Sequence, residues 1–473
     1  MKNTILMLAA ICLAACSQRE GCTVCSEVPP VAAQGYVSLT DGHFTLDGEP
    51  WFPFMLNYKA FIEDDRVVPA PWYTDGDVRA HFDTIAAWGF NAVRVCLDVL
   101  DERKDTAAMF RATRRMVQQA DSAGLHVMLL IKPPFEGYWH DYAVGLMHRL
   151  ADLPALWAYD LMNEPLYFDP EADRDKCDAV ATVREWCRLV RTHAPHQLFT
   201  VATAEPIEVF EWDPSMLPVD FIEMHTYHPL RVKAEMWWYS HYCGKPWMVG
   251  ETGLPADGDS VPYLNQVNFM WETYRYAKIN GAAGYGWWEF QDCPEGVNFE
   301  AQYTGLRDSK GHRKPAADNP NALRGMCLGM LTDKDRLLPA NYYNMLAYRN
   351  VAATGRVVDK KGKPLEGAVV RGWNADWSVG VNTYTDRHGR FRLVSNDICT
   401  HFEVSAPHHC KKKFDKRLSY PAGLTLPDRS REYQQIPLLG WGDGQHILPT
   451  ATKQFEAPTA VEASIGDISL KRL

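Results

Sequence analysis

Between about residue 35 and residue 350, short apolar runs alternate with longer amphipathic runs, and this alternation limits the possible folds more than any other feature of the chain. Near-continuously apolar strands separated by helices predict a parallel sheet that is covered by helices. Eight such units fit a closed (β/α)8 barrel, whereas an open doubly wound sheet would normally show a glycine-rich phosphate turn after its first strand, which this sequence lacks. In chain order the candidate strands read "FPFMLNY", "NAVRVCLD", "HVMLLIK", "LWAYDLMNE", "FTVATA", "FIEMHTY", "WMVGE" and "GYGWWEF".

The pattern changes near residue 350, after "NYYNMLAYRN", which we expect to be the last helix of the barrel. Segments such as "ATGRVVDKKGKPLEGAVVRGW" alternate apolar and polar residues around glycine-containing turns, which predicts a small antiparallel β-sandwich. The charge changes at the same place, because residues 351–473 carry 18 Lys/Arg against 13 Asp/Glu whereas the preceding part carries 31 against 46. The prediction is therefore an acidic α/β barrel over residues 36–350, followed by an all-β, immunoglobulin-like sandwich over residues 351–473. An acidic barrel disfavours nucleic acid as a partner.

The first 15 residues have the pattern of a secretory signal, with an early lysine, a short apolar core and small residues before Cys16. The motif "LAAC" also resembles the bacterial lipobox, and this resemblance implies that Cys16 becomes the lipidated N-terminus of the mature chain. An ordinary signal with a chance cysteine is the alternative. Residues 16–35 then form a flexible tether, and the expected location is the bacterial outer membrane, on its periplasmic or its outer surface.

Polar side chains stand at the carboxyl ends of several predicted strands, which is where barrels of this type hold their chemistry. Two carboxylates that converge from different strands are what glycoside hydrolysis requires, because one protonates the leaving oxygen while the other attacks the anomeric carbon or activates water. An indole ring offers a flat face to a sugar, and histidine and tyrosine offer hydrogen bonds. The candidates are Arg94 in the second strand, Asn163 and Glu164 at the end of the fourth, His225 and Tyr227 at the end of the sixth, Glu251 at the end of the seventh, and Trp287 and Trp288 in the eighth.

Each of these residues also has a plainer interpretation. Glu164 could stand in a capped strand end that turns at the following proline, and Glu251 could be a solvated loop residue. Arg94 could pair with a purely structural acid, and one tryptophan of the pair could serve packing alone. His225 and His228 could suggest a metal pair, but no third ligand is apparent, so no metal is expected. The occurrence of all these residues on the appropriate strands favours the glycosidase interpretation.

The same residues carry a resemblance to glycoside hydrolase family 5, the cellulase-like members of a large clan of retaining enzymes. The resemblance runs through "HFTLDGEPWFPFMLNY", "WGFNAVRV", "WAYDLMNEP", "MHTYHP", "KPWMVGETG", "GYGWWEFQD" and "TGLRDSKGHRKPA". It implies a covalent glycosyl-enzyme intermediate. The resemblance also implies that Glu164 is the acid/base and Glu251 the nucleophile. Asn163 would bind the sugar 2-hydroxyl, and Arg94 would hold Glu251. His225 and Tyr227 would line the pocket, and Trp288 would be the platform of the −1 subsite.

The sugar itself is left open by the sequence. We expect an endo-acting β-glucanase or β-mannanase that works as a monomer without a cofactor, with an exo-β-glycosidase or transglycosylase as the alternative. Asn57 at the end of the first strand, and Trp139 and His140 after the third, are further candidates for substrate binding. A second class of function is a surface glycan-binding lipoprotein without activity. The C-terminal part resembles the carboxypeptidase regulatory-like family, in "TGRVVDKKGKPLEGAVV" and "TYTDRHGRF", which implies a seven-stranded accessory module.

Overall fold

The structure is a computed structural model of the 473-residue chain. It describes residues 29–99, 105–131, 137–168, 174–227, 231–259, 261–293, 302–326, 351–377, 379–395, 397–422, 424, 426 and 461–473. Cys16, His228 and the expected last barrel helix, residues 341–350, lie outside these ranges, so the predictions that concern them remain predictions. Within the described ranges, no helix combines the length and the apolar character that crossing a bilayer requires.

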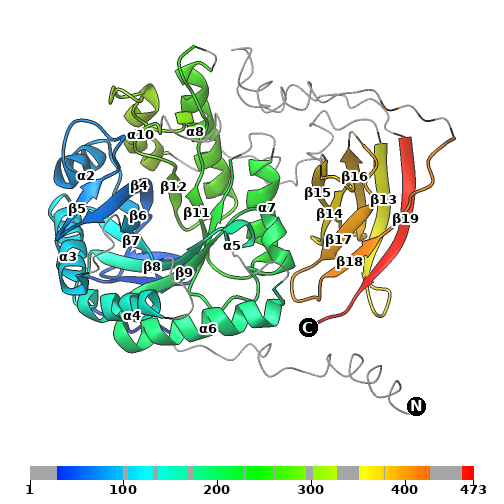
Figure 1. The fold of residues 1–473 in the computed structure, drawn as a ribbon, viewed down its shortest axis with the longest axis horizontal. Helices are drawn as coiled ribbons and strands as arrows, with labels where there is room; N and C mark the ends of the chain where they lie inside the picture. Colours follow the sequence, from blue (N-terminus) through cyan, green and yellow to red (C-terminus); the bar gives the residue numbers. More distant parts are fainter. Residues whose placement is uncertain are drawn as a thin grey trace.

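The first part of the chain is a closed parallel barrel of eight strands, as the sequence predicts (Figure 1). Neighbouring strands follow one another in chain order, and β12 pairs with β4 to close the ring. Each strand coincides with one of the apolar runs, because a strand that faces both the barrel interior and the outer helices must be apolar on both faces. The strands are β4 (Phe54–Glu63), β6 (Ala92–Val99), β7 (His126–Leu130), β8 (Leu156–Asn163), β9 (Leu198–Thr203), β10 (Ile222–His225), β11 (Trp247–Glu251) and β12 (Tyr285–Trp287).

Amphipathic helices surround the barrel. Aspartates cap the first turns of three of them, since Asp77, Asp105 and Asp175 each accept a hydrogen bond from a backbone N–H of the helix that follows. The longer helices are α2 (Val78–Ala87), α3 (Thr106–Ser122), α4 (Tyr138–Leu150), α6 (Lys176–His193), α7 (Val232–Tyr242) and α8 (Tyr263–Ile279). Short helical turns follow some strands: α5 (Pro165–Phe168), η2 (Pro206–Phe210), η3 (Pro315–Asp318) and α10 (Pro320–Arg324).

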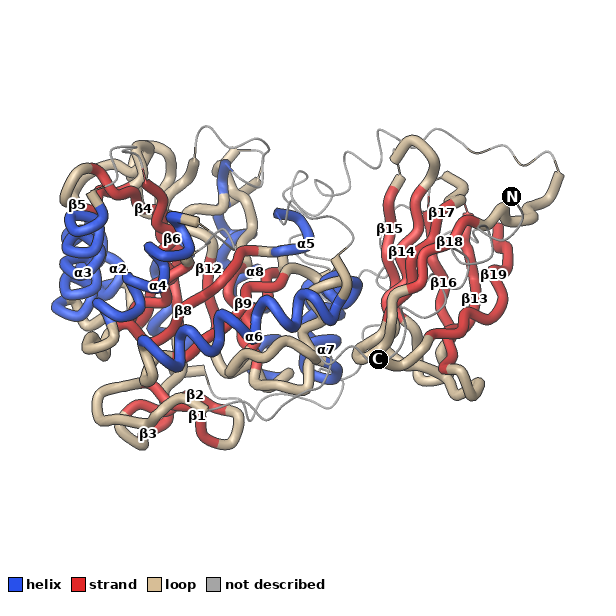
Figure 2. Tube along the Cα trace, turned by 60° about the horizontal axis from the view of Figure 1, so that its bottom comes forward, coloured by secondary structure: helices blue, strands red, loops and turns tan. Residues whose placement is uncertain are grey.

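One end of the barrel is closed by a small antiparallel sheet, β1 (Val37–Thr40), β2 (His43–Leu46) and β3 (Glu49–Pro50). The ring of Phe44 packs edge-on against Trp157 and Phe221 at centroid distances of 5.2 and 5.0 Å. Figure 2 shows this sheet below the barrel, whereas α5, which directly follows β8, lies at the opposite end. The carboxyl ends of the strands are therefore the ends that this sheet does not cover.

The segment that follows the first predicted strand forms a β-hairpin. Strand β4 continues to Glu63, and β5 (Arg66–Pro69) returns antiparallel to it. The turn between them places Asp64 at φ +54°, a left-handed conformation that aspartate tolerates better than most residues. Alternating burial along the second half of β4 confirms a strand that extends past the barrel rim.

The C-terminal part contains two sheets of three and four strands within the described residues, consistent with the predicted sandwich. The predicted antiparallel order is wrong for one pair, because β13 and β19 run parallel. One sheet has the order β16 (Arg390–Ser395), β13 (Val351–Asp359), β19 (Val461–Leu470); the other has the order β15 (Gly380–Tyr384), β14 (Val369–Trp373), β17 (His401–Ser405), β18 (Lys412–Asp415).

The sandwich is joined to the barrel by buried polar contacts as well as by apolar packing. Lys176, at the start of α6, lies 2.8 Å from Asp213 and donates to the carbonyl oxygen of Ala406 at 3.0 Å. The backbone N–H of His408 donates to the same Asp213 at 3.1 Å. Val369 of β14 is completely buried within the barrel's own apolar cluster. These contacts fix the sandwich against the barrel instead of leaving it on a flexible linker.

Candidate active site

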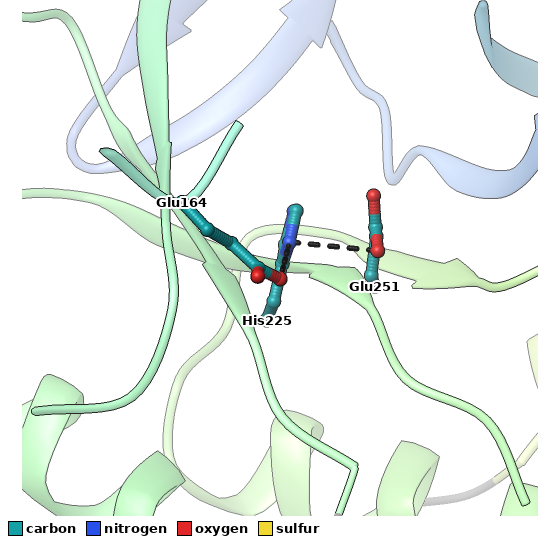
Figure 3. Close-up of side chains that lie close together, drawn as sticks. All are labelled: Glu164, His225 and Glu251. Atoms are coloured by element: carbon teal, nitrogen blue, oxygen red, sulfur yellow. Dashed lines mark hydrogen bonds and ion pairs between the residues drawn. The ribbon is translucent and has the colours of Figure 1, made fainter. Parts of the chain in front are cut away.

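Two glutamates and one histidine meet at the carboxyl ends of β8, β10 and β11 (Figure 3). Nδ1 of His225 lies 2.7 Å from Oε1 of Glu164 and 3.5 Å from Oε2 of Glu251. One ligand-type atom from each of the three residues lies within 4.8 Å of the other two, so the two carboxyl groups face a common space. Glu251 is 4% exposed, whereas the side chain of Glu164 is 18% exposed, so Glu164 is the more accessible of the two.

Strand register explains why these side chains converge. His225 on β10 is the partner of Glu251 on β11, after an irregularity that follows Met224. Glu164 directly follows β8, and its N–H donates to the carbonyl oxygen of Ala202 on β9. Its backbone has φ +47°, a left-handed conformation that is uncommon for glutamate and that typically costs free energy. The protein thus holds this carboxyl group at the strand end in a strained conformation.

Arg94 lies on β6, is completely buried and contacts several residues of the site. Its guanidinium forms an ion pair with Oε1 of Glu251 and donates two hydrogen bonds to Asp160, at 2.7 and 2.9 Å. It also donates to Oδ1 of Asn163 at 2.9 Å and to Oδ1 of Asn57 at 3.1 Å. The planar fork of arginine suits several acceptors at once, so this one side chain orients residues from three other strands, β4, β8 and β11.

Tyr227 completes the environment of Glu251 by donating a hydrogen bond from its hydroxyl to Oε2 at 2.5 Å. Burial and the negative charge of Glu251 raise the pKa of Tyr227 well above its usual range, so the phenol stays protonated and remains a donor. With Arg94 on Oε1 and Tyr227 on Oε2, each oxygen of Glu251 has a donor. The carboxylate is therefore fixed in one orientation.

The charge state of His225 follows from its neighbours. Burial disfavours the imidazolium, but the charge of Glu251, the hydrogen bond to Glu164 and the nearby carboxyl group of Glu223 outweigh it and raise the pKa of His225 to about 10. Burial also disfavours the charged form of Asp160, and it therefore raises the pKa of this carboxyl group to about 7, although the adjacent Arg94 opposes that increase. At neutral pH the histidine is thus a cation between two acidic side chains.

Glu223 and Gly250 form the floor of this cluster. The carboxyl group of Glu223 is completely buried, 3.2 Å from Nε of Arg94 and 3.7 Å from Nε2 of His225. A Cβ atom on Gly250 would lie 1.9 Å from an oxygen of Glu223, so only glycine leaves room for this carboxyl group. Glu223 and Asp160 were not predicted as site residues. Each is an acidic residue within an apolar strand, and that pattern could have indicated a buried polar cluster.

The remaining predicted site residues lie in different places. Asn57 is completely buried and donates to the carbonyl oxygens of Gly250 and Trp287 at 2.9 and 3.0 Å, so it braces the strands beneath the cluster. Trp287 is also fully buried, and its indole N–H donates to the carbonyl oxygen of Thr304 at 3.0 Å, which fits a packing role. Trp288 directly follows β12 and is half-buried, with Nζ of Lys59 5.7 Å from its ring centroid.

Trp139 and His140 lie in a helix, and their described ring contacts are with residues of α4 and α6. Both belong to the first turn of α4, where a loop after the third strand was expected. The ring of His140 lies 5.0 Å from that of Trp186 on α6, and Trp139 packs edge-on against Tyr142 at 5.7 Å. Trp139 also lines a cavity of about 290 Å³ at the ends of β6 and β7, to the side of the glutamates.

Two further carboxyl groups near the site were not predicted. Glu208 of η2 is completely buried and accepts hydrogen bonds from the N–H groups of Leu166 and Ala204, which anchors the turn after Glu164. Burial, together with the charge of Glu164, raises the pKa of Glu208 well above its usual range. Glu289 accepts a hydrogen bond from Tyr73 at 2.7 Å, and burial raises its pKa to about 8.

Glu164, His225 and Glu251 are also a possible set of metal ligands by their composition. Their chemistry fits a metal poorly, however. Nδ1 of His225 is already engaged with Oε1 of Glu164 at 2.7 Å. Arg94 and Tyr227 already donate to both oxygens of Glu251. The arrangement suits proton transfer and nucleophilic attack by carboxyl groups.

Neither a family model nor a curated protein matches the chain. Among solved structures, the chain is similar to a GH5_18 protein from Streptomyces cattleya in complex with GlcNAc, with 19% identity and a TM-score of 0.46 over 65% of this chain and 84% of that one. An endo-1,4-beta-mannanase from Rhizomucor miehei gives 15% identity and a TM-score of 0.45, over 62% and 100% of the two chains. A beta-D-glucuronidase from Dictyoglomus thermophilum is 14% identical and gives a TM-score of 0.46, and the match covers 62% of this chain and 54% of that one. Such low values identify neither a family nor a substrate for this chain.

Proposed function

We propose that the protein is a retaining β-glycoside hydrolase of the family 5 type, with Glu164 as acid/base and Glu251 as nucleophile. The observation that carries this proposal is the pair of carboxyl groups from two different strands, with oxygens within 4.8 Å of each other across His225. Retaining glycosidases separate their carboxyl groups by about 5–5.5 Å, whereas inverting enzymes need a wider gap for a water molecule.

In the first step, an oxygen of Glu251 attacks the anomeric carbon of the substrate while Glu164 transfers its proton to the leaving glycosidic oxygen. The glycosidic C–O bond breaks, an ester bond to Glu251 forms, and the leaving sugar departs with a new hydroxyl group. The donors on Glu251 hold it ready for attack, since Arg94 and Tyr227 fix both of its oxygens. The greater exposure of Glu164 suits a group that must reach a leaving group at the mouth.

In the second step, Glu164 takes a proton from water, and the water oxygen attacks the anomeric carbon and breaks the ester bond to Glu251. The proton balance of the site supports this change of role. His225 is hydrogen-bonded to Glu164 and carries a proton at neutral pH, so it can stabilise the carboxylate that Glu164 becomes after the first step. A sugar hydroxyl in place of water would give transglycosylation with the same residues.

The proposed substrate is a β-linked glucan or mannan, cleaved internally or from an end. Trp288 would stack against the sugar in the −1 subsite, and Asn163 would bind its 2-hydroxyl. Asn57 is shielded by the strands above it and would act through Arg94 and the backbone, not by touching sugar. The proposal also includes a lipid anchor on Cys16 that holds the enzyme at the outer membrane, with the glycan as the partner.

A glycan-binding protein without activity is the second candidate. Three features favour hydrolysis over binding alone: the facing glutamates, the donors on Glu251 and the histidine between them. Binding alone would not require a buried carboxylate with a donor on each oxygen.

The test is a product screen with the purified protein on β-1,4-glucan, β-mannan, β-1,3-glucan and xylan, beside Glu164→Gln and Glu251→Gln as controls. We expect oligosaccharides from one polymer, with release abolished in both variants. Azide should rescue Glu251→Ala as an α-glycosyl azide and Glu164→Ala as a β-glycosyl azide, because azide replaces the nucleophile in one and the water in the other. The opposite stereochemistry would reverse the assigned roles, and unchanged release by both Gln variants would refute the mechanism.

A further inference from the structure

Three aromatic rings stack on the outer face of the four-stranded sheet of the sandwich. Trp373 on β14 is the cross-strand partner of His401 on β17, with ring centroids 5.7 Å apart and planes 22° from parallel. Trp377 stacks on Trp373 at 4.8 Å and 14°. Trp373 is only 6% exposed, whereas Trp377, at the outside of the stack, is 55% exposed. The stack therefore presents one large flat indole to solvent.

The turn that carries Trp377 is strained and braced, which packing alone does not explain. Trp377 has φ +59°, a conformation that a bulky side chain rarely adopts. Asn374 fixes the turn by accepting a hydrogen bond from the N–H of Val379 at 3.0 Å and by donating one to Asp397 at 3.1 Å. Strain that is maintained by surrounding contacts is commonly found at functional positions. Here it holds an apolar ring out in water.

Cationic groups flank the exposed ring. The guanidinium carbon of Arg371 lies 5.2 Å from the centroid of Trp377, and Nζ of Lys413 lies 5.8 Å from that of Trp373. An indole face packs well against the C–H face of a sugar ring, and neighbouring donors can bind its hydroxyl groups. Bases of single-stranded nucleic acid also stack on such rings, so the test below includes an oligonucleotide as well as the glycans.

The position of the ring relates it to the proposed active site. Just before β14, the carbonyl oxygen of Gly367 accepts a hydrogen bond from Trp238 of α7, and Val369 is buried in the barrel cluster. From there β14 continues for four residues to Trp373, a rise of roughly 13 Å at about 3.3 Å per residue. Figure 2 shows the connection from β14 to β15 on the same side of the molecule as α5, the turn that follows Glu164. The connection from β14 to β15 and the end of β8 thus lie on the same side of the molecule.

We propose that Trp377, supported by Trp373 and flanked by Arg371, is a sugar-binding platform that holds the polysaccharide chain whose bond the barrel cleaves. This inference rests on the proposed glycosidase function for the identity of the ligand. A chain long enough to reach both places would be bound at two points, whereas a short oligosaccharide would occupy the barrel alone.

The test uses the full protein in native gels that contain each of the four polymers, with Trp377→Ala, the conservative Trp377→Phe, and Leu264→Ala as a control at another exposed apolar residue, 61% exposed on α8. Because Trp377 is exposed, the Ala variant should fold, which its circular dichroism spectrum will check. We expect one polymer to retard the wild type, Trp377→Phe and Leu264→Ala, and to retard Trp377→Ala much less. Equal retardation of Trp377→Ala, or retardation by an oligothymidylate instead of a glycan, would overturn the platform.

Kinetics separate this proposal from the proposed function. The platform predicts that Trp377→Ala raises KM for the polymer roughly five- to tenfold, and less than about twofold for a trisaccharide of the same sugar, without changing kcat. Unchanged KM for the polymer would overturn the platform and leave the glycosidase intact. Glycan binding that depends on Trp377, in a protein that releases no product, would support the platform and overturn the glycosidase.

Discussion

Nδ1 of His225 lies 2.7 Å from Oε1 of Glu164, so the proposed acid/base is hydrogen-bonded to a buried imidazole. The same imidazole lies 3.5 Å from Glu251, and the pKa of His225 is raised to about 10. A fixed cation at this point compensates negative charge that moves between the two glutamates during the reaction. A preorganised charge of this kind stabilises the transition state without reorganisation of solvent.

The first prediction concerns the activity of a variant that lacks this cation. His225→Gln keeps hydrogen-bonding capacity but loses the charge, and we expect kcat/KM to fall by roughly 100-fold or more with little change in KM. Steady-state kinetics on the polymer identified in the screen would measure it. A variant that loses affinity but keeps kcat would show that His225 binds substrate and does not support the chemistry.

The second prediction concerns stability as a function of pH. The pKa of His225 is raised in the folded protein from 6.5 to about 10, so folding favours the protonated form. Its contribution to stability is fully present below pH 6.5 and is lost as the pH rises toward 10. Urea unfolding of the wild type and of His225→Gln between pH 6 and pH 10 should therefore give curves that converge at high pH. A constant difference would contradict the raised pKa.

Much of the barrel was predictable from sequence because each strand is a local apolar run and aspartates cap three of the helices. The same is not true of the floor of the site. Asp160 and Glu223 lie within apolar strands, and their inward direction and shared partner Arg94 follow only from the register of the closed barrel. The start of α4 was not predictable from sequence either, because Gly137 precedes it and no side-chain cap marks its first turn, in which Trp139 and His140 lie.

The third prediction concerns Arg94, whose guanidinium contacts Asp160, Glu223 and Glu251. Arg94→Met leaves these buried carboxyl groups without their common cation, and such a loss typically costs about 3–5 kcal/mol of stability. Arg94→Lys retains the charge but not the fork, so it should keep more of the stability than of the activity. Chemical denaturation and kcat/KM of the two variants would measure both effects. Equal activity of Arg94→Lys and the wild type would show that the fork does not position Glu251.

The fourth prediction concerns Gly250, where a Cβ atom would lie 1.9 Å from the carboxyl group of Glu223. Gly250→Ala should destabilise the protein by about 1–3 kcal/mol through overpacking and should lower activity by displacing the adjacent Glu251. Glu223→Ala removes the colliding atoms, so the double variant should be more stable than the sum of the single effects predicts. A double-mutant cycle from urea unfolding would measure this coupling, and simple additivity would exclude the collision as the cause.

The fifth prediction concerns the junction of the barrel and the sandwich. Lys176 is buried between Asp213 and the carbonyl oxygen of Ala406, and Asp213 in turn accepts a hydrogen bond from the N–H of His408. Burial lowers the pKa of Lys176, but the charge of Asp213 opposes this and keeps the pair together. Lys176→Met leaves Asp213 charged and buried without its partner, which typically costs about 3–5 kcal/mol.

Because these contacts cross the junction, we expect Lys176→Met to turn a single calorimetric unfolding transition into two, with the sandwich released first. Arg188→Met, at an exposed ion pair on the same helix α6, is the matched control and should leave the transition unchanged. If the platform at Trp377 and the barrel bind the same polysaccharide chain, Lys176→Met should also raise KM for the polymer more than KM for a trisaccharide. A single transition at the wild-type temperature would mean that the apolar contact around Val369 alone holds the two parts together.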